Sequence, residues 1–168
     1  MKFNELGIGK DAPRVVNTVV EIPKGSSNKY EVDAQTGLVK LDRVLYSPIH
    51  YPWDYGYIVG TRYTDGDPMD ILIIASYPTF PGCVVEARPI GILGMSDEKG
   101  RDDKVVSVSH RDPRMADVNS IDDLADHLRK EIYHFFEVYK ELEDKQVNVL
   151  GWESADVARD LILKFKLS

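Results

Sequence analysis

The chain has 168 residues, of which 43% are hydrophobic and 29% are charged, and its formal net charge is −7. This length and composition predict one globular domain over residues 1–168 with a sizeable hydrophobic core. The acidic charge argues against a general binder of nucleic acid or anionic membranes, although it permits an anionic substrate where metals reverse the local charge.

The first two thirds of the chain predict short strands separated by glycine and proline. Alternating or β-branched segments indicate strands over 15–23, 28–33, 38–45, 55–59, 69–75, 84–95 and 104–109. Many short strands with this punctuation are typical of a closed or nearly closed barrel.

The last third of the chain predicts helices. Apolar residues at helical spacing form one stripe from Leu124 to Leu142. Ser120 or Asp122 could cap the start of this helical region, because both side chains accept hydrogen bonds from free backbone amides.

A short strand over 146–149 is expected to precede the last helix. Ser154 is expected to cap that helix, which runs to about Leu167. Its predicted buried face consists of Ala155, Ala158, Leu161, Ile162 and Phe165. The predicted fold class is therefore α+β, a small barrel with two main helices packed outside it.

The segment 65–70, Asp-Gly-Asp-Pro-Met-Asp, lies directly before the apolar run 71–75. Three carboxylates this close together repel one another and resist burial unless a proton or a cation neutralises them. Asp65 and Asp67 alone would fit a solvated turn, but Asp70 enters the strand among mostly apolar neighbours. Mg²⁺ takes oxygen ligands, so the segment predicts a site for such a cation, with a spacing unlike that of an EF-hand.

Some basic residues lie where strand periodicity predicts apolar ones. Arg43 shares a strand face with the apolar residues Val39, Leu41 and Leu45. A guanidinium there needs an anionic partner, and a structural ion pair explains it as well as a bound anion does. The same reasoning applies more weakly to Lys104, which begins its strand.

A second acidic segment, 97–103, also lies between two predicted strands and could complete an oxygen-ligand site with the first. The spacing of the remaining polar candidates has simpler explanations. Lys29 and Glu31 fit a solvated strand face, Tyr139 fits the core stripe of the helix, and Lys140 fits its solvated side.

Two further features concern the location of the protein. Cys83 is the only cysteine, so no intrachain disulfide can form, and this fits a reducing cytoplasm. Residues 1–13 lack the apolar segment of a signal peptide, and no apolar run approaches the roughly 20 residues that span a bilayer. We therefore expect a cytoplasmic protein with no membrane partner.

Five motifs follow one another along the chain, at 22–31, 51–58, 65–71, 97–104 and 134–140. Together they resemble the family I soluble inorganic pyrophosphatases of the short prokaryotic type, over about residues 15–163. The resemblance implies hydrolysis of pyrophosphate to two phosphates by direct attack of a metal-activated water. It implies several Mg²⁺ ions per site, for which Mn²⁺ or another divalent ion could substitute. It also implies a five-stranded OB-like β-barrel and a homohexamer.

The resemblance assigns roles residue by residue. The implied metal ligands are Glu31, Asp65, Asp70, Asp97 and Asp102. The implied phosphate binders are Lys29, Arg43, Tyr55, Tyr139 and Lys140. Asp67 is implied as the general base that takes a proton from the attacking water. Lys104 is implied as a further substrate-binding residue, and Glu21 as an additional polar residue of the site.

Two other functions compete with this reading. An OB-like barrel could bind nucleic acid, but it would need an exposed basic and aromatic groove, which the acidic balance disfavours. A catalytically silent relative is the third hypothesis, and the intact set of acidic and basic positions argues against it.

Overall fold

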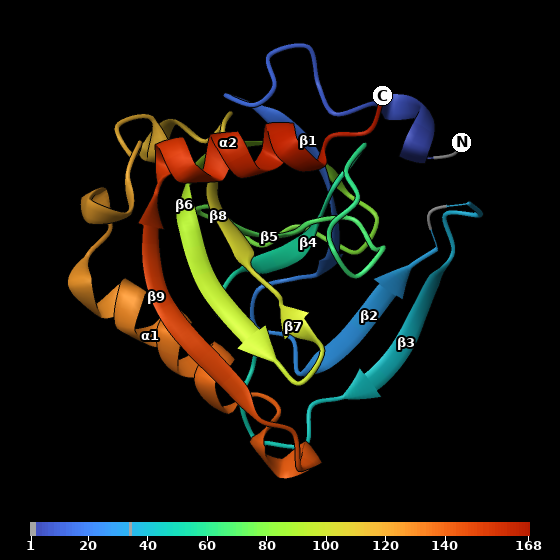
Figure 1. Ribbon diagram of the computed structural model, residues 1–168, viewed down its shortest axis with the longest axis vertical. Coiled ribbons are helices and arrows are strands. Elements are labelled where there is room, and N and C mark those ends of the chain that lie inside the picture. Colours follow the sequence, from blue (N-terminus) through green and yellow to red (C-terminus); the bar gives the residue numbers. More distant parts are fainter. Residues whose placement is uncertain (1–2, 34) are drawn as a thin grey trace.

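The computed structural model describes residues 3–33 and 35–168, and its central feature is a closed ring of five strands (Figure 1). In ring order the strands are β1 (Val16–Ile22), β4 (Asp54–Ile58), β5 (Asp70–Ile74), β8 (Lys104–Ser109) and β6 (Val84–Asp97). β1 pairs back onto β6, and β5 and β8 run parallel while the other ring pairs are antiparallel. The predicted five-stranded OB-like α+β architecture is confirmed.

Two further strands extend the sheet along β6. β7 (Gly100–Arg101) pairs with the end of β6, and β9 (Val147–Ser154) pairs along much of its length. The sequence predicted β9 only over 146–149, whereas the strand continues past Gly151 to Ser154. Gly151 has φ +118°, which favours glycine, and the facing register shifts between Gly94 and Met95.

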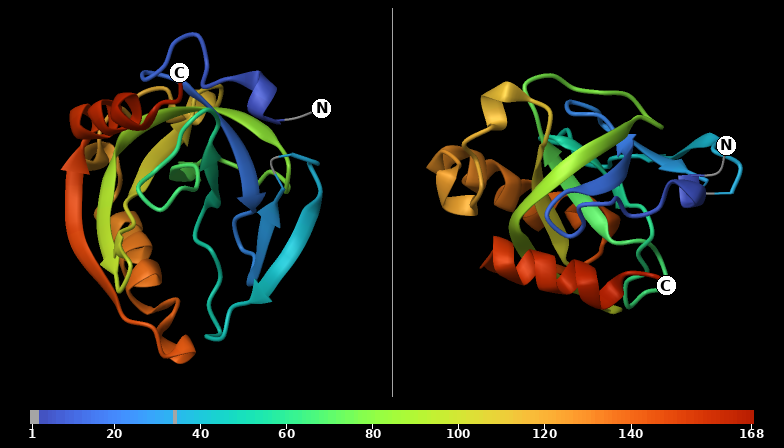
Figure 2. Two further views of the ribbon diagram at one scale, coloured as in Figure 1. Left: turned by 45° about the vertical axis from the view of Figure 1, so that its right-hand side comes forward. Right: turned by 90° about the horizontal axis from the view of Figure 1, so that it is seen from above.

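A separate hairpin of β2 (Asn28–Val32) and β3 (Val39–Val44) stands beside the ring (Figure 2). Both strands were predicted, but the apolar face expected for the second one is wrong. Val39 and Leu41 are 45% and 48% exposed, and of that set only Leu45, just after β3, is a buried apolar residue. The hairpin forms its own two-stranded sheet, and within residues 3–33 and 35–168 Val39 and Leu41 remain exposed rather than packed in a core.

The two main helices pack on different parts of the sheet. α1 (Asp126–Val138) lies along β9, and α2 (Ala155–Phe165) crosses one end of the ring over β6 (Figures 1 and 2). Short 3₁₀ turns are η1 (Phe3–Leu6), η2 (Pro113–Met115), η3 (Ile121–Asp123) and η4 (Glu141–Glu143). None of the helices in residues 3–33 and 35–168 is long and apolar enough to cross a membrane.

The helix ends follow the sequence in part. Ser120 forms a capping box with Asp123 at η3, whereas α1 begins later, at a position without a side-chain cap. Leu142 is 60% exposed, so its place in the core stripe was a wrong prediction. The stripe ends at Tyr139 because α1 stops there and the chain turns through η4.

The last helix confirms its predicted cap. The Val157 amide donates to Ser154 Oγ at 3.3 Å, and the helix ends at Phe165 rather than near Leu167. On its predicted buried face, Ala158 and Ile162 are fully buried and the other three residues are half-buried.

Beyond α2 the chain pairs with the loop that connects β4 to β5. The Arg62 amide donates to the Phe165 carbonyl, and the Leu167 amide donates to the Gly60 carbonyl, both at 2.9 Å. An antiparallel bridge joins Thr61 to Lys166 between them. We call residues 165–167 the C-terminal strap, because they fasten the base of that loop.

Strand β5 is covered on both faces, which explains its continuous apolar sequence. Ile71 and Ile73 pack in a core that includes Ala158 and Ile162 of α2. Leu72 and Ile74 pack in a second core with the apolar stripe of α1, which contributes Ile132, Phe135 and Phe136. This double coverage fixes the strand that carries Asp70 at its first position.

Candidate active site

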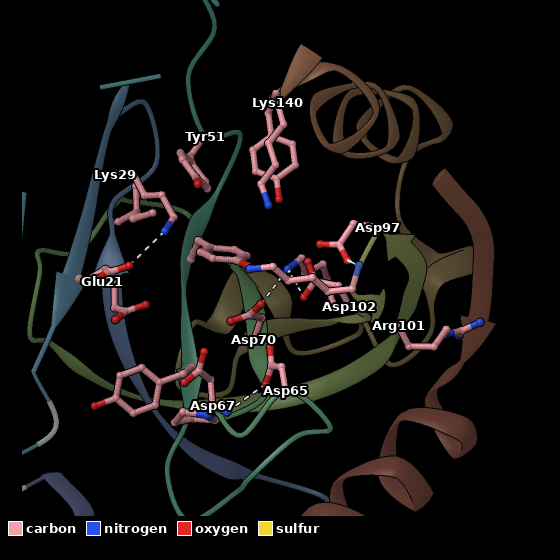
Figure 3. A pocket seen from close by; sticks show the side chains of 18 of the residues that line it. Glu21, Lys29, Tyr51, Asp65, Asp67, Asp70, Asp97, Arg101, Asp102 and Lys140 are labelled. Atoms are coloured by element: carbon pink, nitrogen blue, oxygen red, sulfur yellow. Dashed lines mark hydrogen bonds and ion pairs between the residues drawn. The ribbon is translucent and has the colours of Figure 1, made fainter. Parts of the chain in front are cut away.

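A polar pocket of about 750 Å³ lies where the hairpin, the ring and the end of α1 meet (Figure 3). The predicted site residues that line it are Glu21, Lys29, Glu31, Tyr55, Asp65, Asp67, Asp70, Asp97, Asp102, Lys104, Tyr139 and Lys140. They come from β1, β2, β4, β8, both acidic segments and the residues after α1. Residues that are far apart in the sequence therefore face one cavity.

The first acidic segment is a tight turn at the mouth of β5. The Asp67 amide donates to Asp65 Oδ1 at 2.9 Å, and Gly66 between them has φ +90°, where glycine is favoured. The Tyr63 amide donates to the Asp67 carbonyl at 2.7 Å and closes the turn. Both carboxylates stay exposed at the pocket, and Asp70 follows as the first residue of the strand.

The parallel pairing of β5 with β8 brings Asp70 and Lys104 together. Ile71 lies opposite Val105, so the two charged residues begin adjacent strands at the same end of the ring. Lys104 Nζ lies 2.7 Å from Asp70 Oδ2 and 2.9 Å from Asp102 Oδ1. The anionic partner expected for Lys104 is thus found, and it is a pair of carboxylates.

Burial makes this triad electrostatically strong. The Lys104 side chain is only 3% exposed, which by itself lowers its pKa, but the charges of Asp70 and Asp102 raise the pKa well above its usual value. Burial raises the pKa of the Asp102 carboxyl because it outweighs the attraction of Lys104. The ammonium occupies the place that a cation between these carboxylates would take.

The second acidic segment is folded back onto β6. Asp97 ends that strand, and its Oδ1 accepts the Lys99 amide at 2.8 Å. The Asp102 amide donates to the Met95 carbonyl at 3.0 Å, so the backbone of the sheet holds this carboxylate at the pocket. The structure therefore brings the two acidic segments to one site.

Arg43 is the predicted site residue that does not line this pocket in the described part of the chain. Its Nη1 lies 2.6 Å from Asp42 Oδ2, and its Nε lies 2.9 Å from Glu143 Oε1 of η4. Of the two explanations that the sequence left open for Arg43, the structure shows the ion pair.

The charge of the pocket fits a hard divalent cation. Carboxylates outnumber cationic side chains along its lining, and carboxylate oxygens are the ligands that such ions prefer. Partial desolvation at the pocket raises the pKa of Asp67, although the side chain stays exposed, and the charges of Asp65 and Asp70 raise it further. Burial also raises the pKa of Glu21 to about 7, and the charge of Asp70 adds to this shift.

As the side chains stand, no three His, Cys, Asp or Glu residues within 3–33 and 35–168 converge closely enough to hold a metal ion. A metal would have to draw carboxylates of the acidic segments closer together, or displace the Lys104 ammonium from between Asp70 and Asp102. Asp65 and Asp67 are exposed enough for the first of these movements. The individual ligand assignments stay predictions.

Several lining residues were not predicted for the site. They are Ile22, Val32, Tyr51, Tyr57, Thr64, Pro68, Lys99 and Arg101. Tyr51 lies in the motif at 51–58 and could have been considered for that reason, and its ring centroid lies 5.4 Å from that of Tyr55. Lys99 and Arg101 carry no such signal, because a charged residue in a loop is usually only solvated.

Comparison with known proteins places the chain among described sequences and structures. Residues 18–167 match the family model described as Inorganic pyrophosphatase. The inorganic pyrophosphatase of Halalkalibacterium halodurans is 51% identical over 150 residues, which cover 89% of this chain and 92% of that protein. The inorganic pyrophosphatase of Sulfolobus acidocaldarius is 50% identical over 161 residues, which cover 94% and 93%.

Solved structures give the same result. The inorganic pyrophosphatase from Thermus thermophilus superposes with a TM-score of 0.91 at 45% identity, covering 95% of this chain and 94% of that one. The inorganic pyrophosphatase of Helicobacter pylori superposes with a TM-score of 0.90 at 40% identity and covers 94% of both chains. The similarity thus spans the ring, the helices and both acidic segments.

Proposed function

The chain belongs to the inorganic pyrophosphatase family, and we propose that it hydrolyses pyrophosphate to two phosphates in a Mg²⁺-dependent reaction without a covalent phosphoenzyme. The observation that carries the proposal is the pocket itself, where two carboxylate segments face lysines and tyrosines. Pyrophosphate is a compact polyanion, so a site for it needs both cationic side chains and carboxylates that bring in metals.

When bound, Mg²⁺ neutralises the charge of pyrophosphate and lowers the pKa of the attacking water. We propose Glu31, Asp65, Asp70, Asp97 and Asp102 as its ligands. The donor chemistry of these carboxylates supports this assignment, and their origin in both acidic segments suits a site for several ions.

Asp67 is proposed as the general base that accepts a proton from the attacking water. Its raised pKa supports this role, because a carboxylate with a higher proton affinity is a stronger base near neutral pH. Its position on an exposed turn, beside Asp65 but outside the Lys104 ion pairs, leaves the carboxylate free to reach a water.

The proposed phosphate binders approach from different elements. Lys29 lies on β2, and Lys140 follows the end of α1 (Figure 3). Tyr55 and Tyr139 have raised pKa values, that of Tyr139 reaching about 12, both chiefly through burial, so their hydroxyls stay protonated and can donate to phosphate oxygens. Lys104 adds positive charge between them, and transition-state charge on the phosphates is stabilised by such fixed cations.

Two of the proposed residues need an adjustment or have a secondary role. Arg43 can reach a phosphate only by leaving Asp42 and Glu143. A polyanion with more negative charge could compete with these two carboxylates for the guanidinium. Glu21, whose pKa is near 7, accepts the Val32 amide and is proposed as a polar residue behind Glu31.

The reaction is tested by measuring phosphate release from pyrophosphate with Mg²⁺, with EDTA, and with ATP as the comparison substrate. Rapid release from pyrophosphate that EDTA abolishes is the expected result. No release with any divalent metal would refute the proposed activity.

The base assignment has its own test. Asp67→Asn should lower turnover by about 10²- to 10⁴-fold while the protein stays folded. The exposed Asp117→Asn is the matched control, because it changes the same functional group away from the pocket. Full activity of Asp67→Asn would rule out the base.

We further propose a cytoplasmic homohexamer that uses Mg²⁺, for which Mn²⁺ or another divalent ion could substitute. The resemblance described above supports the oligomer, and a single cysteine supports a reducing compartment. Light scattering that gives the mass of a monomer at micromolar concentration would refute the hexamer.

A further inference from the structure

One buried carboxylate beside the site faces away from the pocket. Asp103 lies between Asp102 and Lys104 in the sequence, but it does not line the cavity, and its side chain is only 6% exposed. Its Oδ1 lies 2.8 Å from Arg101 Nη2 and accepts the Met95 amide at 3.1 Å. None of the proposed chemistry uses this group.

The remaining oxygen of Asp103 reaches the other acidic segment. The Tyr63 hydroxyl donates to Asp103 Oδ2 at 2.8 Å, over a separation of 40 residues, and both side chains are buried. A hydrogen bond to a buried charged group is among the stronger ones in proteins. It joins the loop before β5 to the connection between β6 and β8.

The backbone of Tyr63 continues this link into the carboxylate turn. Its amide donates to the Asp67 carbonyl at 2.7 Å, and its carbonyl accepts the Gly66 amide at 3.0 Å. Its ring packs edge-on against Phe165 of the C-terminal strap, with the centroids 4.8 Å apart. The Tyr63 side chain is therefore held at two points, the ring by Phe165 and the hydroxyl by Asp103.

We propose that Tyr63 and Asp103 are positioning residues that set the distance between the two acidic segments, and that this distance determines how tightly the site binds divalent cations. The inference rests on the proposed function, because it concerns the same carboxylates. Lys104 joins Asp70 to Asp102, but it does not reach the turn that carries Asp65 and Asp67. Repulsion between the like charges would therefore move this turn away from the second acidic segment if Tyr63 did not hold it. A metal that binds both segments would then have to draw them back.

The magnitude follows from the behaviour of groups that orient metal ligands. Loss of such a partner typically weakens metal binding about 10- to 100-fold. We expect the lower end, about 10-fold, since the backbone contacts of Asp102 to Met95 persist when the Tyr63 hydroxyl is removed. At saturating Mg²⁺ the ligands are drawn into place, so turnover should change less than the Mg²⁺ requirement.

The test uses Tyr63→Phe, Asp103→Asn and the double variant of the full chain, with Mg²⁺ binding measured by calorimetry without substrate. Tyr63→Phe keeps the ring on Phe165, and Asp103→Asn keeps an acceptor for the Met95 amide. The matched control is Tyr133→Phe, whose hydroxyl lies 3.4 Å from the Val149 carbonyl outside the pocket. We expect each single variant to weaken Mg²⁺ binding about 10-fold, the double variant to be no worse than the worse single one, and the control to be unchanged.

A second readout does not need metal. If the link is real, Asp103→Asn should speed amide hydrogen exchange in residues 63–67, which are distant in sequence, and Tyr63→Phe should speed it near residue 103. Should Asp103→Asn fail to fold, Tyr63→Phe alone decides both readouts.

Mg²⁺ affinity within twofold of the unchanged protein in Tyr63→Phe would overturn the inference, even if its melting temperature fell. In that case phosphate release by the unchanged protein still supports the proposed function. If the unchanged protein binds no divalent cation and releases no phosphate, the proposed function fails as well, and the two failures are thereby distinguished.

Discussion

Glu21 offers a stability test that is independent of catalysis. Its carboxyl lies behind the hairpin, where Oε1 accepts the Val32 amide at 3.0 Å, and burial raises its pKa from an ordinary 4.5 to about 7. Replacing it in Glu21→Gln removes the ionisation while an oxygen remains to accept that amide. The unchanged protein should therefore be less stable than the variant wherever Glu21 would be ionised.

The sign and size follow from proton linkage. A raised pKa means that the native state binds the proton more tightly than the unfolded state does. The contribution of Glu21 to native stability is therefore complete below pH 4.5 and is lost as the pH rises through about 7. One pKa unit corresponds to about 1.4 kcal/mol. The free energy of unfolding of Glu21→Gln should therefore exceed that of the unchanged protein by about 3 kcal/mol at pH 8 and by less than about 1 kcal/mol at pH 5.

Urea unfolding in EDTA at pH 5 and pH 8, at one protein concentration, measures this difference. With an ordinary urea dependence of about 1–3 kcal/mol per molar, the unfolding midpoint of Glu21→Gln should lie about 1–3 M higher in urea at pH 8. At pH 5 the midpoint should be almost unchanged. Glu137→Gln, on the exposed side of α1, is the matched control. An equal gain at both pH values, or no gain at pH 8, would refute the assignment of the effect to ionisation.

Lys104→Met should destabilise the metal-free protein by about 3–5 kcal/mol, because Asp70 and Asp102 lose their shared buried partner. An unchanged urea midpoint would contradict this. Gly56→Ala would place a Cβ 1.9 Å from the Val19 carbonyl oxygen, so β1 and β4 would have to separate at a cost of about 3 kcal/mol or more. A folded variant with the original melting temperature would show that the close approach is unimportant. Mg²⁺ at about 100 times its Kd should add about 2.7 kcal/mol to native stability, and identical melting curves in Mg²⁺ and EDTA would argue against metal binding.

The strands and helices were largely predictable because their apolar periodicity reports burial. The segment 69–75 was found in this way, and the structure buries both of its faces. Periodicity gave wrong predictions where apolar residues in a regular pattern are not buried. On β3, Val39 and Leu41 alternate as a core strand would but remain exposed, and Leu142 continues a helical stripe beyond the end of the helix.

Residue types near the site were predictable, but their partners were not. Asp70 and Lys104 stood out as charges at the ends of apolar strands, and parallel pairing makes them neighbours. Arg43 stood out for the same reason, yet its partner Glu143 lies 100 residues away on η4 and has no local signal. The bond between Tyr63 and Asp103 was missed because it depends on tertiary contact alone.

The C-terminal strap has a consequence for the order of synthesis. Residues 165–167 hydrogen-bond to residues 60–62, at the base of the loop that carries the first acidic segment. At translation rates of about 5–20 residues per second, that loop leaves the ribosome on the order of ten seconds before its strap. A nascent chain can therefore form the ring strands that follow the loop before residues 165–167 are available to fasten the base of that loop.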